Sequence, residues 1–139
     1  MTRIAARRHP HQVLVALLLV LSGLPILAGS ARAGSLATTV PTALVTAWAV
    51  TVVLGGLLVL LAAVWREAVT PLYLELVADL PLAMTCAAYA VAVFASAGLG
   101  AVVSGGIIAA ASVAFGARFV QVARTLSQLR RELAGREDA

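Results

Sequence analysis

The longest uncharged run in the chain, Leu80 to Ala117, holds 38 consecutive residues without an Asp, Glu, Lys or Arg. As one helix it would extend about 57 Å at 1.5 Å per residue, roughly twice the ~30 Å hydrocarbon thickness of a bilayer. The run must therefore fold back on itself. Gly98-Leu99-Gly100 and Ser104-Gly105-Gly106 lie near its middle, where glycine lets a chain reverse without a polar loop. These features predict a hairpin of two transmembrane helices.

Composition supports a membrane setting for the whole chain. Hydrophobic residues make up 62% of the 139 and charged residues 12%, whereas soluble domains carry about 25% charged residues. A water-soluble fold of this size could not bury so much apolar surface. The sequence therefore predicts an all-α integral membrane protein.

Two further apolar stretches precede the hairpin. Val13 to Gly29 follows a basic N-terminal tail over residues 1–12, and Pro41 to Trp65 is a second uncharged stretch. Pro81 predicts that the chain kinks or restarts there, with Asp79 capping the third helix. We expect a four-helix transmembrane bundle over residues 13–122, with helices near 13–29, 41–65, 79–98 and 101–122, and a basic amphipathic C-terminal tail over 123–139.

The first stretch has a second interpretation. Its 17 residues barely span a bilayer, and Ser22, Gly23 and Pro25 weaken its far half. Ala31-Arg32-Ala33 then fits the small-x-small pattern of a signal-peptidase site. A cleaved signal peptide over residues 1–33, which would leave three helices, therefore competes with a first membrane span, and we hold both open.

Arginines set the expected topology. All ten basic side chains are Arg: three lie in the N-terminal tail, one in the 66–79 connection, five from Arg118 onward, and only Arg32 on the opposite side. This distribution predicts a bacterial cytoplasmic (inner) membrane protein with both termini in the cytoplasm. Anionic lipid headgroups account for the net charge of +4, so we expect the lipid bilayer as partner and no nucleic acid. Headgroup or partner contacts are expected for Arg118, Arg124, Arg130 and Arg131.

An apolar stripe continues past the last span. Its members recur at intervals of three and four on a helix that otherwise carries Arg, Gln, Ser and Glu. With barely two heptads it is too short for an independent coiled coil. The tail either lies on the inner leaflet or pairs with copies of itself in a homo-oligomer. The stripe comprises Phe119, Val122, Leu126, Leu129 and Leu133.

The connection between the second and third spans is acidic. Glu75 and Asp79 would share a helix face at i, i+4. Two carboxylates at that spacing could bind a cation or relay protons. Negative charges beside helix N-termini at the interface explain them as well, and we favour this second interpretation.

Small residues recur every four positions along both hairpin helices. In lipid, close backbone approach through such residues drives helix association. They give the hairpin a face for tight packing, first of the two helices on each other and then of one chain on another. The stripes are Ala88, Ala92, Ser96 and Gly100 on the third helix and Gly106, Ala110 and Ala114 on the fourth.

No catalytic constellation is found along the sequence. There is no Ser/His/Asp, Cys/His, His-Glu-x-x-His or Gly-x-Gly-x-x-Gly arrangement, and the single cysteine, Cys86, lies in an apolar span. We therefore expect no enzymatic activity, no catalytic residues, no cofactor and no metal site.

In layout the chain resembles the small multi-span, holin-like membrane proteins of actinobacterial phages and prophages. The shared features are the basic N-terminus before Val13, three or four spans, the Ala/Gly-rich hairpin over 80–117, and the Arg-rich tail from Arg118 to Arg136. The resemblance implies self-association in the cytoplasmic membrane and an effect on its permeability. Two other functions stay open: a non-catalytic accessory or scaffold subunit of a membrane complex, and a small-solute transporter that uses Glu75 and Asp79.

Overall fold

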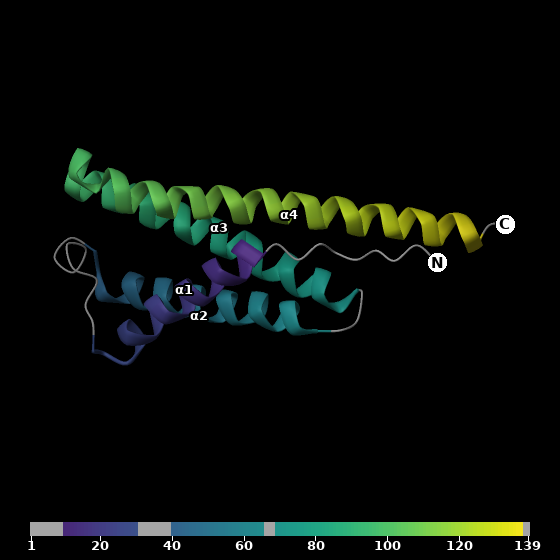
Figure 1. Ribbon diagram of the computed structural model, residues 1–139, viewed down its shortest axis with the longest axis horizontal. Helices are drawn as coiled ribbons and strands as arrows, with labels where there is room; N and C mark the ends of the chain where they lie inside the picture. The colour runs from purple at the N-terminus through teal and green to yellow at the C-terminus, as the bar shows by residue number, and fades with distance from the viewer. Residues whose placement is uncertain (1–9, 31–39, 66–68, 138–139) are drawn as a thin grey trace.

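The computed structural model describes residues 10–30, 40–65 and 69–137, and every regular element in these ranges is helical. The α-helices are α1 (Pro10–Leu27), α2 (Thr42–Val64), α3 (Thr70–Ala97) and α4 (Val102–Glu137), with a short 3-10 helix, η2 (Gly98–Ala101), between the last two (Figure 1). The all-α prediction is confirmed.

Three of the helices, α2, α3 and α4, are long and apolar enough to cross a membrane. The apolar part of α1, Gln12–Leu27, is shorter, about 24 Å against ~30 Å of hydrocarbon. Three helices of the described part of the chain thus have the length and apolar character that membrane spans require, and the four-span bundle stays a prediction.

Each helix packs on the helix that follows it in the chain. The extensive contacts join α1 to α2, α2 to α3 and α3 to α4. Figure 1 shows α4 continuing past the ends of α2 and α3 on one side. At 1.5 Å per residue α4 is about 54 Å long, so it cannot lie wholly within a hydrocarbon layer of ~30 Å.

The hairpin turns at the first of the two predicted glycine groups. Gly98 ends α3 with φ 54° and ψ −139°, a backbone conformation that side chains with a Cβ rarely adopt. The second group lies inside α4, where Gly105 packs beneath the ring of Phe94. A Cβ built at Gly105 would lie 2.8 Å from Cζ of that ring. One glycine thus reverses the chain, and the other lets α3 and α4 approach closely.

The predicted restart at Pro81 is wrong. α3 runs without a break from Thr70 to Ala97, with Pro81 inside it, so Asp79 is an interior helical residue rather than a cap. Proline lacks an N–H, so only the Val77 carbonyl loses its helical partner. Packing holds the helix together across this point, because Ala78 and Leu82 on either side of Pro81 are both buried in the core.

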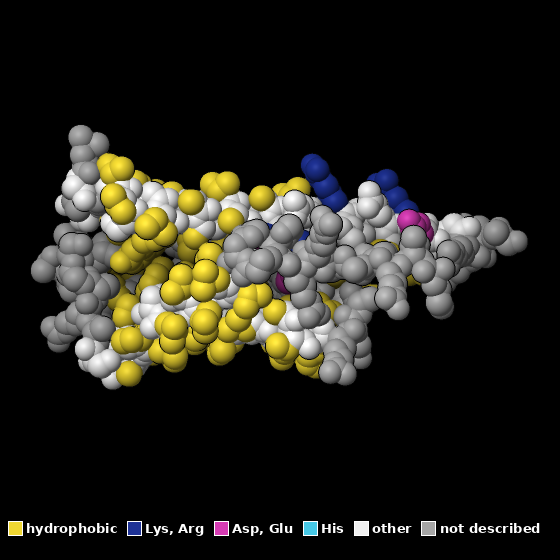
Figure 2. Space-filling view, viewed as in Figure 1, with side chains coloured by type: hydrophobic (Ala, Val, Ile, Leu, Met, Phe, Trp, Pro, Cys, Tyr) yellow, Lys and Arg dark blue, Asp and Glu magenta, His cyan; other side chains and the backbone are white. Residues whose placement is uncertain are grey.

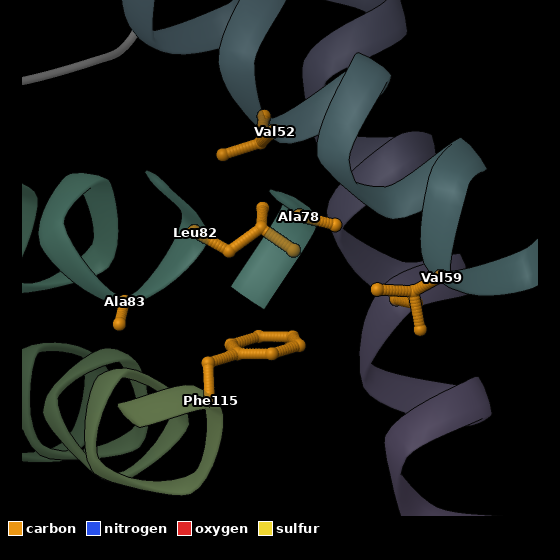
Figure 3. Packing of buried hydrophobic residues seen from close by; sticks show 7 residues of the cluster. Val52, Val59, Ala78, Leu82, Ala83 and Phe115 are labelled. Atoms are coloured by element: carbon orange, nitrogen blue, oxygen red, sulfur yellow. The ribbon is translucent and has the colours of Figure 1, made fainter. Parts of the chain in front are cut away.

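The main core is built where all four helices meet. Figure 3 shows Leu82 of α3 between Val52 of α2 and the ring of Phe115 of α4. Ala16 of α1 is fully buried in the same cluster. The helices are therefore joined by one apolar centre, made of Ala16, Val52, Val59, Ala78, Leu82, Ala83 and Phe115.

Two features of the sequence analysis lie outside the described residues. These are the signal-peptidase pattern Ala31-Arg32-Ala33 and the arginines Arg3, Arg7, Arg8, Arg32 and Arg66. The structure therefore adds no observation of the cleavage pattern itself.

Candidate functional site

The most polar part of the interior surrounds two carboxylates of α3. Glu75 and Asp79 lie one helical turn apart on the same face, 8% and 0% exposed respectively. Acidic side chains are almost never fully buried unless they are paired. The i, i+4 spacing predicted a shared helix face for these two residues, and the structure in addition buries both of them between the helices.

Arg118 of α4 pairs with Glu75. Its Nε donates to Glu75 Oε2 at 2.9 Å and its Nη2 donates to the same oxygen at 2.7 Å. The two side chains are 14% and 11% exposed, so the ion pair is largely shielded from solvent. Arg118, which we expected at lipid headgroups or a partner, instead ties α4 to α3 within one chain.

Asp79 has no such partner. Neither carboxylate oxygen forms a hydrogen bond to any residue that the structure describes, and both oxygens are buried. The charges of Glu75 and Arg118 act on Asp79 with opposite signs. Since both Arg118 bonds go to Glu75, Asp79 is left without a donor of its own.

One further polar group reaches Asp79 from α1. The side-chain amide of Gln12 lies near the Asp79 carboxylate, yet its Nε2 is buried and forms no hydrogen bond within the described residues. A buried polar atom without a partner costs about 1–3 kcal/mol, and more if it is charged. The cluster of Gln12, Glu75, Asp79 and Arg118, here called the acidic cluster, therefore holds unsatisfied groups on two helices.

The acidic cluster lies far from the hairpin turn. Asp79 is 18 residues, about 27 Å, before the end of α3, and Arg118 is 16 residues, about 24 Å, after the start of α4. In Figure 2 hydrophobic side chains cover most of the body, and the charged side chains visible in that view lie toward the end where α4 extends. With the turn at one surface of a ~30 Å layer, the cluster would lie just inside the opposite surface.

A pocket of about 280 Å³ adjoins the acidic cluster between α1 and α4. Gln12 and Arg118 line it together with Gln121, and the rest of its wall is apolar. Two members of the cluster therefore border a space large enough for several water molecules.

A second pocket, of about 400 Å³, lies between the first half of α2 and the second half of α3, away from the acidic cluster. The rings of Trp48 and Tyr89 stack in its wall with centroids 4.7 Å apart. Thr51 and Thr85 are its other polar residues, so the pocket is predominantly apolar.

The remaining predicted arginines have different surroundings. Arg124 and Arg131 are exposed, and Arg130 makes one long contact, 3.5 Å, to the Tyr73 hydroxyl. All three side chains are exposed, so contacts with headgroups or a partner stay a prediction for them, in contrast to the largely buried Arg118.

The apolar stripe beyond the last span is covered from within the chain. Val122 and Leu126 are buried against Leu72 of α3, with Leu76 and Leu129 at the edge of the same cluster. Neither the membrane surface nor a second copy is needed to cover this part of the stripe. Leu133 differs, because it is 62% exposed.

The small-residue stripes are not what packs α3 against α4. Gly100 and Gly106 have no atom within 4 Å of a Cβ position, and Ala110 and Ala114 are exposed. On α3, Ala88 and Ser96 are exposed and Ala92 packs beside Val93. The close contacts use neighbouring positions instead: Gly105 under Phe94, and Ser112, whose hydroxyl donates to the Ala83 carbonyl at 2.7 Å.

Sequence reasoning missed the glycines that join α1, α2 and α3. A Cβ at Gly56 would lie 2.6 Å from Val20 Cγ2 and 2.9 Å from the Ala16 carbonyl of α1, and a Cβ at Gly55 would lie 2.7 Å from Leu82 of α3. Gly23 packs equally closely on Val53. The adjacent Gly55-Gly56 pair in an otherwise bulky span was the signal available in the sequence.

No family model, curated protein or solved structure matches this chain. Within the described ranges no group of three or more His, Cys, Asp or Glu side chains is placed to hold a metal ion. The function must therefore be argued from the geometry of this molecule.

Proposed function

We propose that the chain is a small, self-associating protein of the bacterial cytoplasmic membrane that changes membrane permeability in a holin-like manner. Both termini would lie in the cytoplasm, as the arginine distribution indicates. The observation that supports this proposal best is the outward face of α4.

That face is apolar and includes several small residues. α4 packs on α3 with one side only, and just 11% of its most apolar window is buried, against 39% for α2 and for α3. Val103, Ile107, Ala110 and Ala114 are exposed along it, and Gly106 beside them has open space at its Cβ position. Small residues in such a surface let a second helix approach closely in lipid.

Self-association is tested by adding bulk to this face. Ala110→Ile should shift the purified protein in detergent from an oligomer toward a monomer, measured as molar mass by light scattering. The matched control is Ala87→Ile, which adds the same side chain at an exposed position of α3. Equal mass distributions for the native chain and both variants would count against the α4 interface.

The effect on permeability is tested in cells. Inducible expression in a bacterium should collapse the membrane potential abruptly, reported by a potential-sensitive dye, and Ala110→Ile should delay or abolish the collapse. Slower growth with an intact potential would overturn the proposal.

A second function is supported by the free end of α4. α4 extends beyond α2 and α3 (Figure 1), and Leu133 and Arg131 are exposed near its C-terminal end, with Arg124 exposed further back along the helix. An accessory subunit could dock a cytoplasmic partner there. Affinity purification in mild detergent distinguishes the two functions: a stoichiometric foreign protein, lost on Leu133→Asp, supports the subunit, and a homo-oligomer alone supports self-association.

A further inference from the structure

The acidic cluster carries one more negative group than it has positive partners. Glu75 and Asp79 face a single guanidinium, that of Arg118, and both of its hydrogen bonds go to Glu75. α2 has no ionisable residue in Thr42–Val64, and α1 presents the uncharged Gln12 to the cluster. With both carboxylates ionised, the described part of the cluster therefore has a net charge of −1.

A buried charge without a partner is far more costly than a surface charge, since the protein interior solvates ions poorly. The Asp79 side chain does not reach solvent, because Asp79 is 0% exposed and Leu82, one turn further along, is also fully buried. One positive charge at the Asp79 carboxylate would neutralise the cluster, as a proton on one oxygen or as a metal ion shared by both.

The surroundings of Asp79 also supply an uncharged side chain that can bind a cation and a pocket through which a cation can enter. The Gln12 side chain adjoins Asp79 without completing a hydrogen bond, so its amide can turn its oxygen toward a cation. The pocket of about 280 Å³ between α1 and α4 borders Gln12 and Arg118, which places a space for water next to the cluster.

We propose that Asp79, with Gln12 and Glu75 beside it, is a binding site for one small monovalent cation, H⁺ or a dehydrated alkali-metal ion, and that this cation holds α1 on the α3–α4 hairpin. Release of the cation leaves the uncompensated carboxylate between the helices and weakens the contact of the Gln12 end of α1 with α3, while α1 stays packed on α2. This inference does not depend on self-association through the outward face of α4.

The test measures cation-dependent stability of the full-length protein in detergent micelles. The thermal unfolding midpoint is recorded between pH 5 and pH 9 in choline chloride, and then at fixed pH in NaCl, KCl and LiCl at the same ionic strength. All proteins carry His9→Gln and His11→Gln, which removes the imidazoles that would titrate in this range. Asp79→Asn is compared with Glu132→Gln, which neutralises an exposed carboxylate of α4.

The midpoint of the parent protein and of Glu132→Gln should rise with the cation that binds, and the midpoint of Asp79→Asn should not respond. A response to pH alone identifies the proton, and a response to one alkali metal identifies that ion. Equal responses of the parent and Asp79→Asn, or no response in either, would overturn the proposal.

A second measurement covers the case in which Asp79→Asn does not fold. Gln12→Ala removes the amide ligand but keeps the carboxylate, so a tenfold or greater increase in the cation concentration at half-effect is expected. An unchanged half-effect concentration together with an unfolded Asp79→Asn would contradict the site as described.

Discussion

At the scale of single residues, the ion pair of Glu75 with Arg118 joins α3 to α4 beyond the apolar core. The two residues are 43 positions apart in the sequence, and their bond joins the helices at the end of the hairpin remote from its turn. Ser112 makes a second polar link nearer the middle, to the Ala83 carbonyl. The hairpin is thus fixed at several levels along its length.

Removing one member of this ion pair should cost more than removing both. Arg118→Met leaves Glu75 buried without a cation, and we expect a loss of about 3–5 kcal/mol of stability. The double variant Glu75→Leu/Arg118→Met should recover most of that loss, because Glu75 is no longer left buried without its partner. Unfolding of the single and double variants in detergent measures the coupling, and additive losses would contradict a paired role.

Replacing Gly56 should separate α1 from α2. Gly56→Ala places a Cβ against the Ala16 backbone, which cannot move aside as a flexible side chain would, and overpacking of this kind costs about 1–3 kcal/mol. Gly116→Ala is the control, since a Cβ there meets nothing within 4 Å and alanine favours a helix. A lower unfolding midpoint for Gly56→Ala, with an equal or higher one for Gly116→Ala, is the expected result.

Residues of the candidate site were only partly predictable. The i, i+4 spacing of Glu75 and Asp79 placed them on one face, because this depends on helix geometry alone. The Arg118 partnership and the complete burial of Asp79 depend on how α1, α3 and α4 meet, which no local pattern encodes. Gly55 and Gly56 were overlooked because the stripes spaced by four residues on the hairpin helices were the stronger pattern in the sequence.

At the scale of helices, α4 combines two environments. Its first part packs mainly on α3, places Phe115 in the central core and otherwise presents apolar side chains outward, and its second part packs Val122 and Leu126 on the first turn of α3. Val122 and Leu126 of the predicted apolar stripe are covered by α3 of the same chain, whereas Leu133 is exposed.

A charge in the buried part of the stripe should release the end of α4. Leu126→Asp places a carboxylate against Leu72 and Val122, so we expect rapid proteolysis after residue 118 in detergent-solubilised protein. Leu133→Asp, at a position that is 62% exposed, should leave the digestion pattern unchanged. Identical digestion of both variants would show that the contact with α3 does not order this segment.

The packing of α1 bears on the signal-peptide alternative. α1 contributes Ala16 to the central core and lies against Gly56 of α2. Gly23 of α1 in turn packs closely on Val53 of α2. A cleaved segment would not need a matched surface on the next helix. We therefore expect the intact mass of the membrane-extracted chain to include residues 1–33, and a mass that begins at Gly34 would show that α1 is a leader.

At the scale of the whole molecule, the class of fold followed directly from composition and the long uncharged run. Helix boundaries were predicted to within a few residues for α1 and α2, because uncharged spans and their flanking prolines mark them. The start of α3 was misplaced by nine residues, from 79 to Thr70, because Pro81 was given more weight than the packing of Ala78 and Leu82 around it.

The membrane topology gives a prediction for the complete chain. If nine of the ten arginines lie on one side, as their distribution predicts, reporters fused after Ala139 should be active only in the cytoplasm, and the protein should stay in the membrane fraction after washing at high salt. A C-terminal reporter active outside the cell, or a monodisperse protein in buffer without detergent, would contradict the membrane arrangement.

Packing between chain neighbours also has a consequence for biogenesis. Because α1 meets α2, α2 meets α3 and α3 meets α4, each helix after the first finds a packing partner in the helix synthesised just before it. No helix therefore has to wait in the bilayer without a partner until a distant segment is translated, and helix packing can proceed during synthesis.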